Sequence, residues 1–212
     1  MNFRWLKLLI PALLAPFFFP EPSSAANPGP EVAVMEIQVG RDKKNRRQIV
    51  IGLYDDATPA TVANFKELIQ RNFYRNIRFH RLLPNALVQT GDPLTRLWLF
   101  ASPRPLRAGT GGPGYTVPAE IRVKPTRGAV AMARLPDTIN PSRASNGSQF
   151  FILLDPAPKL DGRFTVFGEI LEGMEVLDEI SNLPADSNDF PLQNITIRSI
   201  KLVPRLADTA RP

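Results

Sequence analysis

The segment 79–92 reads FHRLLPNALVQTGD, and together with the segment 146–152, NGSQFFI, it is the most informative part of the sequence. In both segments polar and apolar residues alternate over short stretches, as expected for strands that bury one face and present the other. Arg81, Gln89 and Gln149 are then polar side chains that project from a rigid sheet surface. The two segments together predict a polar site built on packed strands.

The rest of the chain supplies the strands and helices that such a sheet needs. Alternating or apolar runs predict strands over residues 32–39, 48–54, 78–83, 87–90, 129–133, 149–153, 165–170 and 195–203. Apolar residues at helical spacing predict helices over 59–72 and 173–181, and Thr58 is placed to cap the first of them. Many short strands with only two helices favour a closed antiparallel β-barrel whose ends the helices cover.

Two further blocks complete a family pattern. They are the turn Gly109-Thr110-Gly111-Gly112 and the segment 160–168, LDGRFTVFG. With four blocks in this order, residues from about Val32 to Val203 resemble the cyclophilins, which are peptidyl-prolyl cis-trans isomerases. The resemblance implies a mainly β fold, a closed eight-stranded antiparallel β-barrel capped by two α-helices.

The resemblance also implies the site. Arg81 and Gln89 are expected to be catalytic, and the expected substrate-binding residues are Leu87, Met132, Ala133, Gln149, Phe151, Leu160 and Phe164. Rotation about an X–Pro bond breaks amide conjugation, a barrier of about 20 kcal/mol, and needs a donor near the prolyl nitrogen rather than a nucleophile. Arg81 suits that role because its guanidinium stays protonated and holds its N–H groups in a rigid fork. No metal and no cofactor are expected.

Four residues depart from the family pattern around this site. Ala86 stands where many relatives have Phe, Phe164 where many have His, Lys159 where cyclosporin-sensitive members have Trp, and Arg134 where many have Asn. Arg134 is expected to matter least, because the Asn contacts substrate largely through main-chain groups. The altered pocket leaves an alternative open, a proline-peptide-binding module or chaperone with low turnover. A small-ligand barrel of another family is a remoter alternative, which would need an open interior.

The composition is that of one globular domain and excludes several kinds of site. The 212 residues are 43% hydrophobic, with no cysteine and one histidine. Disulfides, thiol catalysis and a zinc cluster are therefore excluded, and His80 is expected to be a packed strand residue. Of the net charge of +6, much lies in the segment 41–47, RDKKNRR. Because no aromatic residues interleave with these charges, the segment is interpreted as a solvated hairpin loop and no nucleic-acid partner is expected.

The N-terminus carries the pattern of an export signal. Arg4 and Lys7 flank the apolar run 8–19, and the small residues Ser24-Ala25-Ala26 follow. This predicts a cleavable signal peptide over 1–26, and an uncleaved anchor is the alternative. The protein is then expected to be periplasmic or secreted, with no membrane association after cleavage.

The remaining chain is expected to form one isomerase domain over 27–204, followed by a disordered tail over 205–212. The segment 93–108 is longer than the corresponding loop of compact cyclophilins. Its apolar residues 97–100 are expected to pack onto the barrel, and exposure for a partner is the alternative. A monomer is expected, with proline-containing peptides and unfolded exported proteins as partners.

Overall fold

A computed structural model gives the architecture of the chain and describes residues 26–96 and 108–205. The predicted signal peptide over 1–26, except for its last residue, lies outside the described residues. So do the centre of the loop 93–108, with its apolar residues, and almost all of the predicted tail 205–212.

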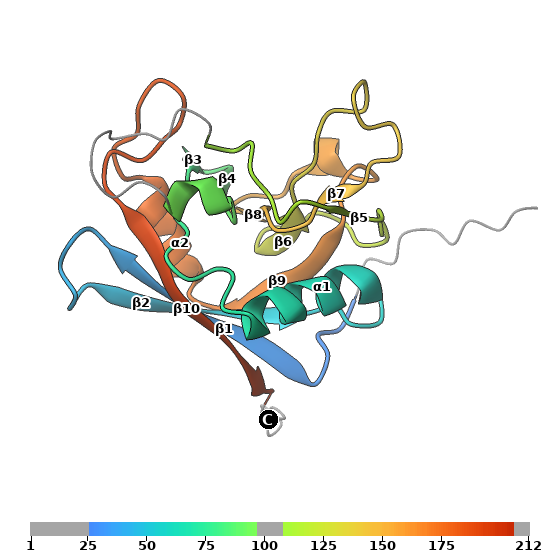
Figure 1. Cartoon of the computed structure of the whole chain (residues 1–212), viewed down its shortest axis with the longest axis horizontal. Helices are drawn as coiled ribbons and strands as arrows, with labels where there is room; N and C mark the ends of the chain where they lie inside the picture. The colour runs from blue at the N-terminus through green and yellow to red at the C-terminus, as the bar shows by residue number, and fades with distance from the viewer. Residues whose placement is uncertain (1–25, 97–107, 206–212) are drawn as a thin grey trace, which may run out of the picture.

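The molecule is organised by an eight-stranded sheet in which every paired neighbour is antiparallel (Figure 1). Along the sheet the strands follow the order β10-β1-β2-β9-β6-β8-β4-β3. Their bounds are β1 (Glu31–Val39), β2 (Arg46–Leu53), β3 (Arg81–Leu83), β4 (Leu87–Thr90), β6 (Ala129–Met132), β8 (Phe150–Leu153), β9 (Val166–Glu172) and β10 (Ile195–Pro204). These are the eight strands that the sequence predicts, each displaced by at most three residues at an end.

The other elements are short. Two α-helices, α1 (Pro59–Gln70) and α2 (Met174–Ser181), lie where the sequence predicts them. Two 3₁₀ turns, η1 (Pro93–Arg96) and η2 (Pro158–Leu160), and a separate two-stranded sheet of β5 (Thr116–Val117) and β7 (Ser145–Asn146) were not predicted. Strands of two residues are too short to show a periodicity in the sequence.

The sheet does not close into a continuous barrel, which corrects the predicted closed barrel. Its end strands β3 and β10 share no ladder. Instead, the segment just before β3 meets β10 through an isolated bridge between Arg78 and Thr196 and a hydrogen bond from the Phe79 N–H to the Ile195 carbonyl, at 3.0 Å. Two further hydrogen bonds, from the Asn76 N–H to the Ile197 carbonyl and from the Ile197 N–H to the Ile77 carbonyl, both at 2.8 Å, extend this contact without making a ladder.

The core lies on the inner face of the sheet, beneath α1. The ring of Phe65, from α1, lies 5.6 Å from that of Phe150 and 5.0 Å from that of Phe167, between centroids. All three side chains are fully buried, and three other apolar residues of α1, Val62, Leu68 and Ile69, are at most 5% exposed. Edge-to-face and tilted packing of this kind adds to the hydrophobic stabilisation of a core.

The start of α1 is capped from a distant part of the chain. Thr58 is the N-cap residue, but its hydroxyl donates back to the Tyr54 carbonyl at 3.2 Å. The carboxylate of Glu120 accepts instead, from the backbone N–H groups of Ala60 (3.1 Å) and Thr61 (2.9 Å). A carboxylate at a helix N-terminus accepts hydrogen bonds from free N–H groups and interacts favourably with the positive end of the helix dipole. Thr58 is therefore the N-cap residue as predicted, but its side chain makes no capping hydrogen bond.

Candidate functional site

A row of directly opposed residues crosses the sheet where the site was predicted. Arg81 on β3 opposes Gln89 on β4, Gln89 opposes Phe151 on β8, and Phe151 opposes Ala131 on β6. Directly opposed residues of antiparallel strands project from the same face with their Cβ atoms about 5 Å apart. The strand register therefore places the guanidinium, the amide and the aromatic ring side by side.

An apolar cluster adjoins this row. Phe151, which is 5% exposed, belongs to a buried apolar cluster against which the partly buried side chains of Leu87, Ala133, Leu160 and Phe164 pack, and we call these five residues the Phe151 cluster. The Phe151 and Phe164 rings meet edge to face, with centroids 5.4 Å apart and an interplanar angle of 89°. The structure thus brings five of the seven predicted substrate-binding residues into one partly exposed apolar surface.

Met132 does not belong to this surface. It is 1% exposed, lies in the main core and opposes Phe150 rather than Phe151. Ala131 and Ala133 flank it on the chain, and successive residues of a strand point to opposite faces. Its predicted role in substrate binding is therefore corrected to a role in the core.

Gln89 of this row is hydrogen-bonded to a second glutamine, Gln149. The Gln89 Nε2 group donates to Gln149 Oε1 at 3.0 Å. The Gln149 Nε2 group donates in turn to the carbonyls of Gly109 (3.0 Å) and Gly111 (2.7 Å). Gln149 is 2% exposed and has both functions of its amide engaged, whereas Gln89 is half-buried and uses only its donor in this pair. Gln89 is therefore the amide whose carbonyl oxygen can accept from a bound peptide.

A buried carboxylate that sequence reasoning missed shapes the turn behind Gln149. Asp92 is fully buried, and its Oδ2 accepts from the backbone N–H groups of Gly109 (2.5 Å) and Gly111 (3.2 Å). Its Oδ1 accepts from the Leu94 N–H at 2.8 Å. In the sequence, this role is indicated by the position of Asp92 at the end of an apolar segment and before the glycine-rich turn. Asp92 orients the two carbonyls that hold Gln149.

Arg81 has a carboxylate partner from a distant loop. Its Nε lies 3.3 Å from Oδ2 of Asp189, and the Asp189 carbonyl accepts from the Leu82 N–H at 2.8 Å. The Arg81 side chain is 44% exposed. Within the described parts of the chain, its two terminal NH₂ groups have no hydrogen-bond partner. Asp189 thus holds one edge of the guanidinium and leaves the other edge for a ligand.

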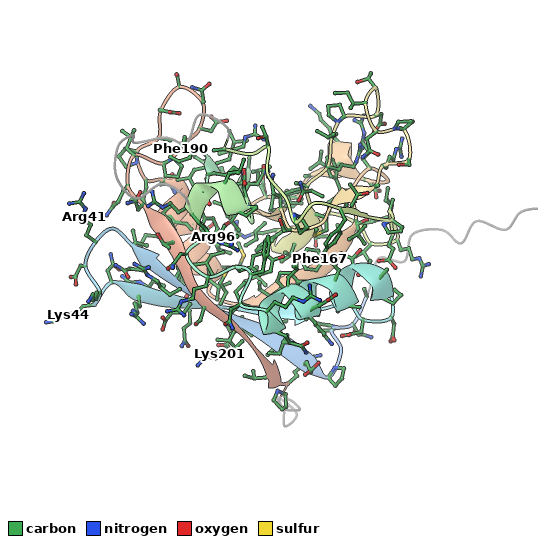
Figure 2. The ribbon with its side chains drawn as sticks, viewed as in Figure 1. Arg41, Lys44, Arg96, Phe167, Phe190 and Lys201 are labelled. Carbon is green, nitrogen blue, oxygen red and sulfur yellow. The ribbon has the colours of Figure 1, made fainter. Side chains whose placement is uncertain are left out.

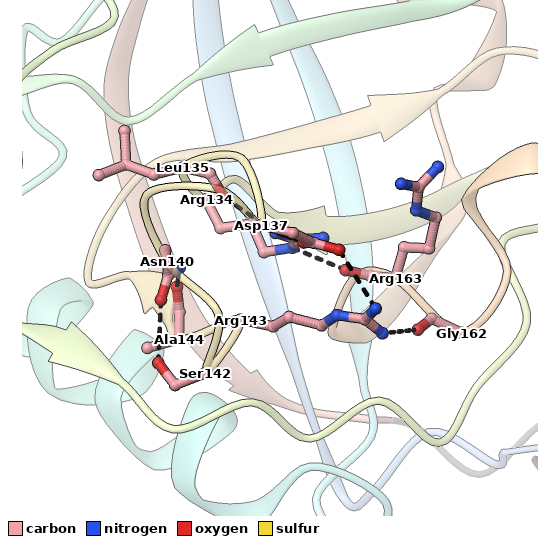
Figure 3. Close-up of polar contacts among 9 residues, drawn as sticks. All are labelled: Arg134, Leu135, Asp137, Asn140, Ser142, Arg143, Ala144, Gly162 and Arg163. Atoms are coloured by element: carbon pink, nitrogen blue, oxygen red, sulfur yellow. Dashed lines mark hydrogen bonds and ion pairs between the residues drawn. The ribbon is translucent and has the colours of Figure 1, made fainter.

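Arg134 covers one side of the Phe151 cluster. Its guanidinium carbon lies 4.8 Å from the centroid of the Phe164 ring. Its Nε donates to the Arg163 carbonyl at 2.7 Å, and its Nη1 lies 2.6 Å from Oδ1 of Asp137 (Figure 3). The Arg134 side chain is 5% exposed. Arg134 was expected to be the least consequential of the four departures from the family pattern. In the structure it places a charged group against the apolar pocket.

The loop that follows Arg134 is held by a second arginine. Arg143 Nη2 lies 3.2 Å from Oδ2 of Asp137, and Arg143 Nη1 donates to the Gly162 carbonyl at 2.8 Å (Figure 3). Hydrogen bonding from Arg134, together with the positive charges of both arginines, lowers the pKa of Asp137. Asp137 therefore remains a carboxylate and ties the loop 134–144 to the segment that carries Phe164.

A groove of about 460 Å³ lies between this loop and the glutamine pair. Gln89, Ala133 and Gln149 line one part of it, and Leu135 and Ile139 line another. Both of these aliphatic side chains are well exposed, at 58% and 69%. The groove begins at Ala133 of the Phe151 cluster, so an extended peptide can continue into it.

His80 lies behind the site as a neutral side chain. It is 6% exposed, which agrees with the predicted packed residue, although it lies just before β3 rather than in it. Burial lowers its pKa from 6.5 to about 4, and the negative charge of nearby Asp92 offsets only part of that shift. At neutral pH His80 therefore carries no charge and is not a proton donor for the site.

Two other features are absent from residues 26–96 and 108–205. In these ranges no group of three or more His, Cys, Asp or Glu side chains is placed to hold a metal ion. In the same ranges no helix is long and apolar enough to cross a membrane.

Comparisons with known proteins show the family to which the chain belongs. Residues 34–202 match the family model described as cyclophilin type peptidyl-prolyl cis-trans isomerase/CLD. The peptidyl-prolyl cis-trans isomerase-like 1 of Aspergillus fumigatus is 36% identical over 161 residues, which cover 72% of this chain and 88% of that protein. The peptidyl-prolyl cis-trans isomerase B of Bacillus subtilis is 38% identical over 138 residues, which cover 64% and 84%.

Solved structures give the same result. A crystal structure of a cyclophilin type peptidyl-prolyl cis-trans isomerase from Cryptosporidium parvum aligns with a TM-score of 0.68 at 25% identity, covering 83% of this chain and 99% of its own. A second crystal structure of that protein, in the presence of the dipeptide Ala-Pro, aligns with a TM-score of 0.65 at 26% identity, covering 81% and 99%. The chain thus belongs to the cyclophilin-type peptidyl-prolyl cis-trans isomerases and shares their activity, the cis-trans isomerisation of peptidyl-prolyl bonds.

Proposed function

We propose that this isomerase acts on X–Pro bonds of exported proteins as they fold, through the row formed by Arg81, Gln89 and Phe151. The observation that carries the proposal is the register, which sets a protonated donor and an amide on the same sheet face as an apolar cluster. The related Cryptosporidium parvum isomerase, whose structure was determined in the presence of Ala-Pro, supports a proline-containing peptide as the ligand.

Each group has a distinct role in the proposed mechanism. The proline ring packs on the Phe151 cluster, and the Gln89 carbonyl accepts from the peptide backbone. A free NH₂ group of Arg81 donates to the prolyl nitrogen, whose lone pair localises only when the X–Pro bond is twisted. An interaction that is stronger in the twisted state than in either planar state lowers the barrier. Asp189 orients the guanidinium for this donation.

The proposal of export rests on the N-terminal sequence. Arg4 and Lys7, the apolar run 8–19 and the residues 24–26 have the order of a secretory signal. The absence of cysteine suits an oxidising compartment, where a free thiol is a liability. N-terminal sequencing of the protein from its own host should begin near Asn27. Recovery of an uncleaved cytoplasmic product would contradict export without affecting the isomerase assignment.

The catalytic proposal is tested by a protease-coupled isomerisation assay on a Xaa-Pro peptide. Arg81→Ala should lower kcat/KM by roughly 30-fold to 1,000-fold, as expected when one preorganised donor is lost. The matched control is Arg71→Ala, since Arg71 is 71% exposed and forms a helix-surface pair with Glu67. Circular dichroism should show both variants folded. A folded Arg81→Ala protein with wild-type turnover would remove Arg81 from the mechanism, and a wild type that binds the peptide without turnover would favour the binding-module alternative.

A further inference from the structure

A second cavity, of about 550 Å³, lies outside the proline site. It is formed by the hairpin of β1 and β2, by β10, and by the turn that follows α1, and it shares no lining residue with the groove beside Gln149. Figure 2 shows Lys201 on β10 and Arg41 and Lys44 at the tip of the hairpin. Its lining contains the cations Lys43, Arg46, Arg75, Arg198 and Lys201.

The charge of this basic cavity is strongly unbalanced. Against its five cations it has one carboxylate, Glu36, so the excess is four positive charges, whereas the whole chain carries an excess of six. Glu36 is already paired with Arg46, at 2.7 Å. Lys43, Arg75 and Lys201 are exposed and form no ion pair with another described residue. A concave surface with charge of one sign concentrates counter-ions of the other sign.

One of the cations is held in place. Arg198 Nε donates to Gln38 Oε1 at 2.8 Å, and its Nη1 donates to Asn76 Oδ1 at 3.0 Å. Gln38 is itself 2% exposed, so the anchor is part of the packed sheet. Burial lowers the pKa of the neighbouring Arg78, and the positive charge of Arg198 lowers it further. A donor that is already ordered loses little entropy when it binds a ligand.

The lining indicates the class of ligand. No aromatic side chain lines the basic cavity, so it has no platform on which nucleic-acid bases stack. Its volume is in the range of about 300–1,000 Å³ that is usual for small-molecule sites. Arginine forks and lysine ammonium groups together are the usual donors to phosphate oxygens. We propose that this basic cavity binds a small polyanion with two or more phosphate groups, independently of the proline site.

Isothermal titration calorimetry of the full chain with inorganic tripolyphosphate tests the proposal. The wild type should bind saturably with one site, and the double variant Arg75→Ser, Lys201→Ser should bind roughly tenfold or more weakly. The matched control is Arg41→Ser, Lys44→Ser, which removes the same charge from exposed residues of the same region that do not line the cavity. The control should keep wild-type affinity, and both variants should keep wild-type isomerase turnover.

Four outcomes would overturn the proposal. The first is no saturable binding by the wild type at low salt, and the second is equal weakening in both double variants, which would indicate diffuse attraction. The third is equal affinity for citrate, a tricarboxylate, which would exclude phosphate selectivity. The fourth is binding to vesicles of anionic phospholipid without binding of tripolyphosphate, which would indicate a membrane surface rather than a cavity ligand.

Discussion

The guanidinium of Arg134 lies over the ring of Phe164, 4.8 Å from its centroid, and the same ring meets that of Phe151 edge to face. Phe164 is therefore packed on two sides, by an aromatic ring of the apolar cluster and by a cation. The carboxylate of Asp137 keeps the cation in this position. A cation over an aromatic face contributes about 0.5–2 kcal/mol, and more of this is realised when water is excluded.

Arg134→Ala should raise KM for a Xaa-Pro peptide by roughly threefold to tenfold, with a smaller change in kcat. The reason is that Phe164 loses one of its two supports and the proline ring then packs against a less ordered surface. The comparison variant is Asp137→Asn, which weakens the ion pair but keeps the arginine, and it should have a smaller effect. A lower KM in Arg134→Ala would mean that the guanidinium obstructs the pocket.

Asp189→Asn should lower kcat by a few-fold while leaving KM and the unfolding midpoint in urea nearly unchanged. Asp189 orients Arg81 through a 3.3 Å contact between partly exposed groups, and such pairs contribute about 0–1 kcal/mol to stability. Glu67→Gln, which breaks the helix-surface pair with Arg71, is the control for a generic loss of charge. A stability loss without a change in kcat would assign Asp189 a purely structural role.

Gly111→Ala should disturb the turn that holds Gln149 in the site. A Cβ at this position would collide with the carboxylate of Asp92, which orients the turn that holds Gln149. We expect kcat/KM to fall and the free energy of unfolding to drop by about 1–3 kcal/mol, as for other overpacked positions. In Gly114→Ala the new methyl group meets no atom within 4 Å, and only the φ of +95° costs stability. Equal kcat/KM in the two variants would argue against the Asp92–Gln149 connection.

His80 should make the protein less stable as the pH falls. Its pKa is about 4 in the folded state against 6.5 ordinarily, so the unfolded chain takes up the proton first. This contribution is fully present above pH 6.5 and is lost as the pH falls from 6.5 toward 4, by up to about 3 kcal/mol.

Urea unfolding between pH 4 and pH 7 measures this effect, with His80→Leu as the comparison. The variant keeps the other titrating groups, including the carboxylate of Asp137, so the difference between the two pH profiles isolates the histidine. The variant should have a shallower fall in the free energy of unfolding. Parallel profiles would show that His80 does not titrate differently in the folded and unfolded states.

The elements of the fold were predictable because each depends on a local pattern, whereas the roles of the site residues were expected from the family resemblance. Alternating or apolar runs of four to nine residues predict the strands, and helical spacing around Phe65 predicts α1. The alternation of side chains along a strand also shows why the prediction for Met132 was wrong. Met132 and Ala133 are adjacent on one strand, so both cannot face the same pocket.

The partners that hold the site residues follow from the tertiary structure alone. Asp189 meets Arg81 across 108 positions of sequence, and Arg134 meets the ring of Phe164 from a separate loop. The incomplete closure of the sheet and the basic cavity likewise depend on segments that are distant in the chain. Local periodicity records which face of a strand or helix is buried. It does not record which loops meet, because strand register and the packing of the whole core determine those contacts.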